Sequence, residues 1–195
     1  MLNLSTQEVV SSIEKAPLVN LDGLLYQEYD NFFGKTYELS IPEDEDFEQL
    51  VNQEDVPRVV LSKKSKVSRQ LAIFFMQSKI TDVLNKKFGV DLKFASVDVW
   101  IDGKGYSQPP HLDDKRVKLH VHVYLTENSV GTSLYSTNIT GSEARCLNET
   151  DPRKKIHTFK FSANKGYALL NNDKSWHGVD EVKEDGRISL YARYS

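Results

Sequence analysis

The chain has 195 residues, 39% of them hydrophobic, which suits one compact domain with a sizeable core. Its charges nearly balance at a net of −3, so no excess of positive charge can neutralise a nucleic-acid backbone, and a nucleic-acid partner is not expected. The single cysteine, Cys146, excludes an internal disulfide, and no apolar run approaches the roughly 20 residues that cross a bilayer. We therefore expect a soluble, cytoplasmic protein that does not act at a membrane.

Helix signals dominate the first half of the chain. Ser5 and Glu8 have the spacing of a capping box, which predicts a short helix that starts there. From Val67 to Phe88, apolar residues recur so that most of them share one helical face, and Gly89 then supplies a C-terminal stop. We expect residues 1–90 to form a helix-rich support.

The second half changes to strand patterns, beginning with an alternating segment from Leu92 to Ile101. Because helices come first and strands later, the order predicts an α+β fold in which an early helix packs on one face of a sheet. Residues 1–195 would then be a single domain, with its β core over residues 91–195.

Two of the expected strands have faces of opposite character, because side chains alternate across a sheet. Between residues 117 and 125, valines and leucines share one face, while His120, His122 and Tyr124 share the other. The last strand, from Arg187 to Tyr194, repeats this division. An exposed polar face would explain either strand taken alone.

A group of three metal-ligating residue types stands out against this background. His111 and Asp113 are two residues apart, so at the end of a strand both side chains can point the same way. His177 lies far downstream. Two imidazoles and one carboxylate form the facial triad that non-haem Fe(II) prefers, which leaves the opposite positions open for substrates and oxygen. A lone His-x-Asp pattern is weak evidence, since it arises by chance in many chains.

Five segments taken together, in their order and spacing, resemble the Fe(II)/2-oxoglutarate oxygenase superfamily, with the His-x-Asp…His…Arg pattern of prolyl-hydroxylase-like enzymes. The resemblance covers roughly Leu92 to Ser195, and it implies a double-stranded β-helix (jelly-roll) core buttressed by the N-terminal helices. The segments are Trp100-Ile101-Asp102-Gly103, Pro109-Pro110-His111-Leu112-Asp113, Val123-Tyr124-Leu125, Trp176-His177-Gly178-Val179 and Gly186-Arg187-Ile188-Ser189.

The resemblance implies roles for the matched residues. His111, Asp113 and His177 would be the catalytic iron ligands, and Arg187, about ten positions after the distal histidine, would bind the far carboxylate of the cosubstrate 2-oxoglutarate. The chemistry also requires such an arginine, because an unpaired carboxylate buried in a barrel would cost several kcal/mol. A guanidinium can meet that carboxylate with two parallel hydrogen bonds.

Further residues are expected around this cosubstrate. Ser189 lies on the same strand face as Arg187, and Tyr124 resembles a position where family members often place a hydroxyl near the same carboxylate. His120 and His122 share the face of Tyr124. We expect them to be hydrogen-bonding wall residues and not metal ligands, because the triad is complete without them.

The loop before the His-x-Asp pattern is a candidate wall of the site. Trp100, Tyr106 and Gln108 come just before it and could reach the cosubstrate or the substrate, although a surface loop with an incidental aromatic residue would look the same. The sequence leaves these contacts open.

The function implied by the resemblance is that of an Fe(II)- and 2-oxoglutarate-dependent dioxygenase, a hydroxylase that uses O2, acts on a small molecule or a peptidyl side chain, and releases succinate and CO2. One alternative is a non-catalytic β-barrel module that binds a metal or 2-oxoglutarate as a sensor or structural protein. Another is a zinc- or manganese-dependent lyase or isomerase on a similar barrel. Neither the primary substrate nor the oligomeric state follows from the sequence.

Overall fold

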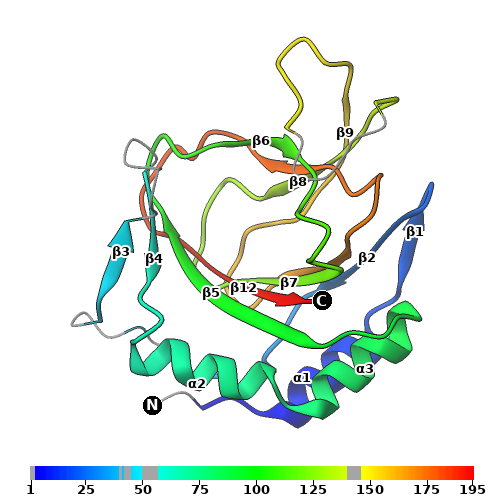
Figure 1. Ribbon diagram of the computed structural model, residues 1–195. Helices are drawn as coiled ribbons and strands as arrows, with labels where there is room; N and C mark the ends of the chain where they lie inside the picture. Colours follow the sequence, from blue (N-terminus) through cyan, green and yellow to red (C-terminus); the bar gives the residue numbers. More distant parts are fainter. Residues whose placement is uncertain (1–2, 40, 42–44, 50–56, 140–145) are drawn as a thin grey trace.

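The structure is a computed structural model that describes residues 3–39, 41, 45–49, 57–139 and 146–195 (Figure 1). These residues contain three helices, and none of the three is long and apolar enough to span a bilayer. The helices are α1 (Thr6–Lys15), α2 (Lys66–Phe75) and α3 (Ser78–Phe88). The strands are β1 (Val19–Leu21), β2 (Leu24–Tyr29), β3 (Phe47–Gln49), β4 (Arg58–Leu61), β5 (Phe94–Asp102), β6 (Gln108–His111), β7 (Leu119–Tyr124), β8 (Thr132–Ser136), β9 (Lys154–Thr158), β10 (Gly166–Leu170), β11 (His177–Val179) and β12 (Arg187–Tyr194).

The strands form two sheets in which every described pairing is antiparallel. The larger sheet has the order β1-β2-β10-β7-β12-β5-β4-β3, and the smaller one has the order β6-β11-β8-β9. In Figure 1 the helices lie along one side of the larger sheet, and β6, β8 and β9 lie on its opposite side. The protein is therefore mostly β, with the helices as an outer layer.

The helices cover the apolar face that the sequence predicted for the central strands. Val121 and Val123 of β7 and Leu190 and Ala192 of β12 are fully buried in one core with the inward residues of the helices. The other face of these strands is buried too: His120 and Tyr124 are 0% exposed. The polar face of β7 is thus an interior wall and not a solvated surface.

The prediction of one helix from Val67 to Phe88 is wrong in one respect, because this segment forms two helices, α2 and α3. Within a single α-helix, five residues at about 100° each would place Ile80 about 140° away from Phe75 around the axis. The chain instead ends α2 at Phe75 and passes through an extended Gln77 before α3 begins. This break turns the apolar residues of both helices toward the same sheet. The predicted stop is confirmed: Gly89 caps α3 in the left-handed conformation, with φ of 68°.

The expected order of helices first and strands later is also wrong, because the described part of residues 1–90 contributes four strands. β2 pairs with β10, and β4 pairs with β5. These partners lie far along the chain, so no local pattern reveals the pairing, and the strands themselves have only three to six residues. The N-terminal segment therefore extends the larger sheet as well as covering it. The helix predicted from the Ser5 cap is confirmed as α1.

Candidate metal centre

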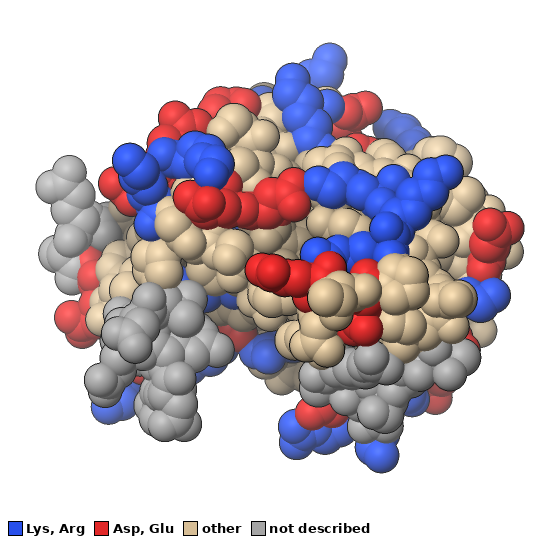
Figure 2. Space-filling view, turned by 90° about the horizontal axis from the view of Figure 1, so that it is seen from above, with Lys and Arg blue, Asp and Glu red and all other residues tan. Residues whose placement is uncertain are grey.

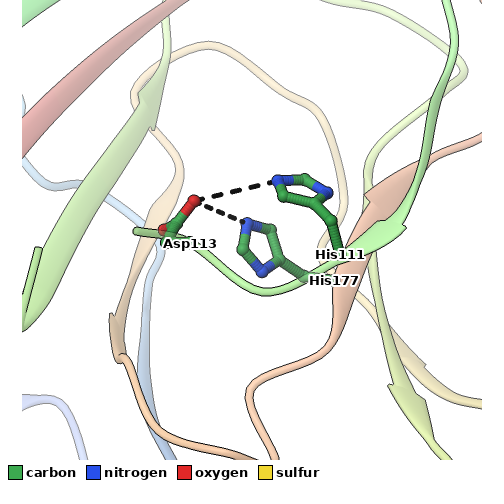
Figure 3. Close-up of side chains that lie close together, drawn as sticks. All are labelled: His111, Asp113 and His177. Carbon is green, nitrogen blue, oxygen red and sulfur yellow. Dashed lines mark ion pairs between the residues drawn. The ribbon is translucent and has the colours of Figure 1, made fainter. Parts of the chain in front are cut away.

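His111, Asp113 and His177 point toward one another in the structure (Figure 3). The Nε2 atom of each histidine lies 3.8 Å from Oδ1 of Asp113. One ligand atom from each residue lies within 4.8 Å of the other two, so a single metal ion could bind all three. The three side chains predicted as a triad therefore converge.

Strand pairing brings the two histidines together. His111 ends β6 and His177 begins β11, and the two residues are register partners across this antiparallel pair. Gly178 makes the close approach possible, because a Cβ there would lie 2.7 Å from the carbonyl oxygen of Gln108. The glycine after the distal histidine thus sets the distance between the two ligand-bearing strands.

Both histidine rings are oriented by backbone carbonyls. Nδ1 of His111 lies 3.0 Å from the carbonyl oxygen of Pro109, and Nδ1 of His177 lies 2.9 Å from that of Ser175. A carbonyl oxygen only accepts, so Nδ1 carries the proton and donates it. The lone pair of each ring is then on Nε2, the atom that faces Asp113.

Two buried side chains fix the carboxylate of Asp113. Nδ1 of His120 and the hydroxyl of Tyr191 both donate to Oδ2, over 2.8 Å and 2.7 Å. Burial raises the pKa of Tyr191, which keeps its hydroxyl a donor. With Oδ2 occupied, Oδ1 is the oxygen that faces the two imidazoles. His120 is therefore a buried hydrogen-bonding partner of Asp113 on the strand face that the sequence predicted, and it is not among the residues that line the adjacent cavity.

The electrostatics of the site favour neutral imidazoles beside an ionised carboxyl group. Burial, followed by the neighbouring His177, lowers the pKa of His111 to about 4, and burial also lowers the pKa of His177. Burial alone would raise the pKa of Asp113, but His177 and the hydrogen bond from His120 outweigh it and hold that pKa well below its usual range. These are the protonation states in which the three groups bind a metal.

The triad opens into a cavity of about 240 Å³. Trp100, Tyr106 and Gln108, whose contacts the sequence left open, line this cavity, and so does His122. The other lining residues are Arg58, Thr132, Tyr167, Gly178, Val179 and Tyr191. A larger hollow of about 570 Å³ lies elsewhere, and its lining holds no group of metal-ligating side chains. The cavity at the triad is therefore the candidate site.

Arg187 is fully buried beside this cavity and belongs to an ion-pair cluster. Its Nη1 donates to Asp102, and its Nε donates to the carbonyl oxygen of Val130 over 3.0 Å. Its guanidinium lies 4.5 Å from the ring centroid of Phe161. Two of the three guanidinium nitrogens thus have protein partners, so a ligand would meet Nη2.

Four buried polar atoms around Arg187 have no hydrogen-bond partner among the described residues. They are Nη2 of Arg187, Oγ of Ser189, Oγ1 of Thr132 and Nε2 of His122. Thr132 and His122 line the cavity, whereas Arg187, Ser189 and Tyr124 lie beside the lining. The hydroxyl of Tyr124 weakly accepts the backbone N–H of Thr132, over 3.4 Å. Unpaired buried polar atoms are costly, so a cluster of them indicates a place for a polar ligand.

Several residues of this site were missed by the sequence analysis. Tyr191 could have been found, because alternation along the last strand puts it on the face of Arg187 and Ser189. Arg58 and Thr132 carried no such signal, since each reaches the cavity through pairing with a distant strand. Asp102 lies in one of the five segments that resemble the oxygenase superfamily, but the pattern gives it no role.

On the face shown in Figure 2, the acidic and basic side chains of the described residues are interleaved. This agrees with the nearly balanced composition. It gives no support to binding of a nucleic-acid backbone on that face.

No family model matches the sequence, and no curated protein matches it. Solved structures do match. The non-heme alpha ketoglutarate dependent carbocyclase SnoK from nogalamycin biosynthesis is 14% identical over 98% of this chain and 84% of its own, with a TM-score of 0.53. A prolyl-4-hydroxylase from Pseudomonas putida is 12% identical over 95% of this chain and 96% of its own, with a TM-score of 0.52.

A third structure is the non-heme alpha ketoglutarate dependent epimerase SnoN. It is 16% identical over 77% of this chain and 65% of its own length, less than two thirds, with a TM-score of 0.52. At sequence identities this low, the structural similarity is evidence for a shared fold alone. The chain shares the fold of the 2-oxoglutarate-dependent oxygenases that it resembles in sequence pattern.

Proposed function

We propose that this protein is an Fe(II)- and 2-oxoglutarate-dependent oxygenase whose two sheets form a double-stranded β-helix within a single domain. The observation that carries the proposal is the convergence of His111, Asp113 and His177, with both imidazole Nε2 atoms 3.8 Å from one carboxylate oxygen. The shared fold supports it independently.

The donor set fits ferrous iron. Two neutral imidazoles and one carboxylate on one face of a metal leave its other positions free for ligands, as in non-haem Fe(II) oxygenases. A structural zinc site would instead be closed by a fourth protein ligand. His120 is not positioned to supply one, because among the described residues only His111, Asp113 and His177 bring their ligand atoms within 4.8 Å of one another.

The surroundings of Arg187 fit 2-oxoglutarate. The distal carboxylate of this cosubstrate would meet Nη2 of Arg187 and the hydroxyls of Ser189 and Thr132, which are buried and without partners among the described residues. Tyr124 lies directly beside them, as the register partner of Ser189. A carboxylate that accepts these donors would satisfy atoms whose isolation is otherwise unfavourable.

When bound, iron and 2-oxoglutarate supply oxidative chemistry that consumes O2, releases succinate and CO2 and oxidises a substrate. The protein holds the reactants and limits access of water. Trp100, Tyr106 and Val179 give the cavity apolar walls, and Gln108 adds a polar group. We propose hydroxylation of a small molecule or a peptidyl side chain, although an epimerase and a carbocyclase share this fold.

The test is coupled turnover of 2-oxoglutarate by the iron-loaded protein with pools of small molecules and peptides. We expect succinate release that depends on Fe(II) and O2, and its loss in His111→Ala and Arg187→Ala. Only His111→Ala should also lose tight metal binding. A protein that binds both iron and 2-oxoglutarate but never releases succinate would instead be a binding module.

A further inference from the structure

Arg58, Asp102 and Arg187 form a row of charges across three neighbouring strands. Arg58 of β4 and Arg187 of β12 are both register partners of Asp102 on β5. Asp102 and Arg187 are 0% exposed and Arg58 is 7% exposed. The row is therefore buried, and each charge in it acts strongly on its neighbours.

The carboxylate of Asp102 is shared unequally between the two guanidinium groups. Arg58 meets it with two nitrogens, Nε to Oδ1 over 2.5 Å and Nη2 to Oδ2 over 3.1 Å. Arg187 contacts the same carboxylate through Nη1 alone. Two positive groups thus face one negative group, which leaves the row with a net charge of +1.

Arg58 is held firmly in this position. Its guanidinium carbon lies 4.1 Å from the ring centroid of Trp100 and 3.9 Å from that of Tyr106, so two aromatic rings pack against it. Such contacts stabilise a buried cation. Trp100 in turn stacks on Tyr191, which donates to the metal ligand Asp113.

Without Arg58, Asp102 and Arg187 would form a neutral one-to-one pair. A neutral pair has no net charge with which to attract an anion, and Asp102 would repel a carboxylate that approached Arg187. With Arg58 present, the positive charge that remains is equal and opposite to that of one carboxylate. The buried Nη2 of Arg187, which has no partner among the described residues, is then the atom left to bind the carboxylate.

We propose that Arg58 is a positioning residue that neutralises Asp102 and so keeps Arg187 available for the distal carboxylate of 2-oxoglutarate. The proposal rests on the proposed function, because it assigns that ligand to Arg187. It makes Arg58 a determinant of selectivity for a dicarboxylate over a 2-oxo acid without the distal charge.

Arg58→Gln tests the proposal with Mn(II)-loaded protein and two probes, 2-oxoglutarate and 2-oxopentanoate, which lacks the distal carboxylate. Calorimetric titration should show the dissociation constant for 2-oxoglutarate raised about tenfold or more, the size expected for loss of a charged hydrogen-bonding interaction. The dissociation constant for 2-oxopentanoate should change less than about twofold. Arg58→Lys, which keeps the charge, should retain most of the affinity for 2-oxoglutarate.

A double variant separates charge from structural damage. Arg58→Gln combined with Asp102→Asn removes one positive and one negative charge, which restores the net charge of +1 on Arg187 alone. We expect it to bind 2-oxoglutarate more tightly than Arg58→Gln, within a few-fold of the wild type. A merely structural role for Arg58 predicts the opposite, since the double variant removes two packed groups.

Three results would overturn the proposal. Arg58→Gln could weaken the binding of both probes equally, or it could leave the binding of 2-oxoglutarate unchanged. The double variant could also fail to recover affinity for 2-oxoglutarate. Mn(II) affinity should stay close to the wild-type level in every variant, because the hydrogen bonds of Arg58 go to Asp102 and not to the three triad residues, and this reports an intact site. A wild-type protein that binds Mn(II) but not 2-oxoglutarate would refute the proposed function itself, which is a distinct result.

Discussion

His111 and His177 are cross-strand partners, and their ring centroids lie only 4.4 Å apart although 65 residues separate them along the chain. Each ring donates from Nδ1 to a carbonyl of its own segment, so both Nε2 atoms face Asp113. The pairing of β6 with β11 therefore places the two imidazoles of the candidate metal centre next to each other.

Gly178→Ala should disturb this pairing. The added Cβ would lie 2.7 Å from the carbonyl oxygen of Gln108 and 3.0 Å from the backbone nitrogen of Pro110, so β6 must move away from β11. We expect Mn(II) affinity to fall about tenfold or more, the effect usual for misplaced ligands. Gly89→Ala is the matched control. The φ of 68° at Gly89 strains an alanine, but nothing lies within 4 Å of the Cβ that the alanine would add. The control should cost about 1 kcal/mol of stability and leave Mn(II) affinity unchanged.

Tyr191→Phe should weaken metal binding through Asp113. The variant removes a donor to Oδ2 and leaves the ring in place, so the carboxylate is free to rotate away from the imidazoles. We expect about a tenfold loss of Mn(II) affinity in an equilibrium titration. Tyr29→Phe removes an equally buried hydroxyl that bonds to Gln27, far from the site. Equal affinities for the two variants would show that Tyr191 has no part in orienting the ligand.

Ser189→Ala should separate ligand binding from stability. Oγ of Ser189 has no partner among the described residues, so its removal should leave the free energy of unfolding unchanged or raise it by up to about 1 kcal/mol. Affinity for 2-oxoglutarate should nevertheless fall about tenfold, because a hydrogen bond to a carboxylate is lost. The reverse pattern, lower stability with undiminished affinity, would mean that the serine serves packing alone.

The metal-free protein should lose stability as the pH falls. Burial and His177 lower the pKa of His111 to about 4, whereas an unfolded histidine titrates at about 6.5. Between these values the unfolded chain binds a proton that the folded protein excludes. The contribution of neutral His111 to the free energy of unfolding is fully present above about pH 6.5. It is lost as the pH falls toward about 4, by as much as about 3 kcal/mol. Urea unfolding in the presence of a chelator should show that the free energy of unfolding falls less steeply with decreasing pH in His111→Gln than in the wild type. An equal pH dependence in the two proteins would contradict the lowered pKa of His111.

Much of the site could be predicted because it depends on the types of residue present and on their order and spacing along the chain. The triad and Arg187 follow a spacing pattern, and alternation along β7 and β12 placed His120, His122 and Ser189 on the interior face. The side chains of His111, Asp113 and His177 lie close together. Their roles toward iron and 2-oxoglutarate stay predictions until binding is measured.

The missing parts depend on contacts between distant segments. Arg58 is one charged residue in a four-residue strand, and only its pairing with β5 brings it to Asp102. Likewise, the break between α2 and α3 is set by the sheet beneath them, because both helices must turn their apolar faces to it. Local periodicity carries no information about either partner.

Anomalous diffraction from crystals grown with Mn(II) and 2-oxoglutarate tests the metal centre most directly. We predict one strong peak about 2 Å from Nε2 of His111, Nε2 of His177 and Oδ1 of Asp113, a normal ligand distance for such atoms. A peak bound by His120 or His122, or a metal held away from His177, would contradict the account.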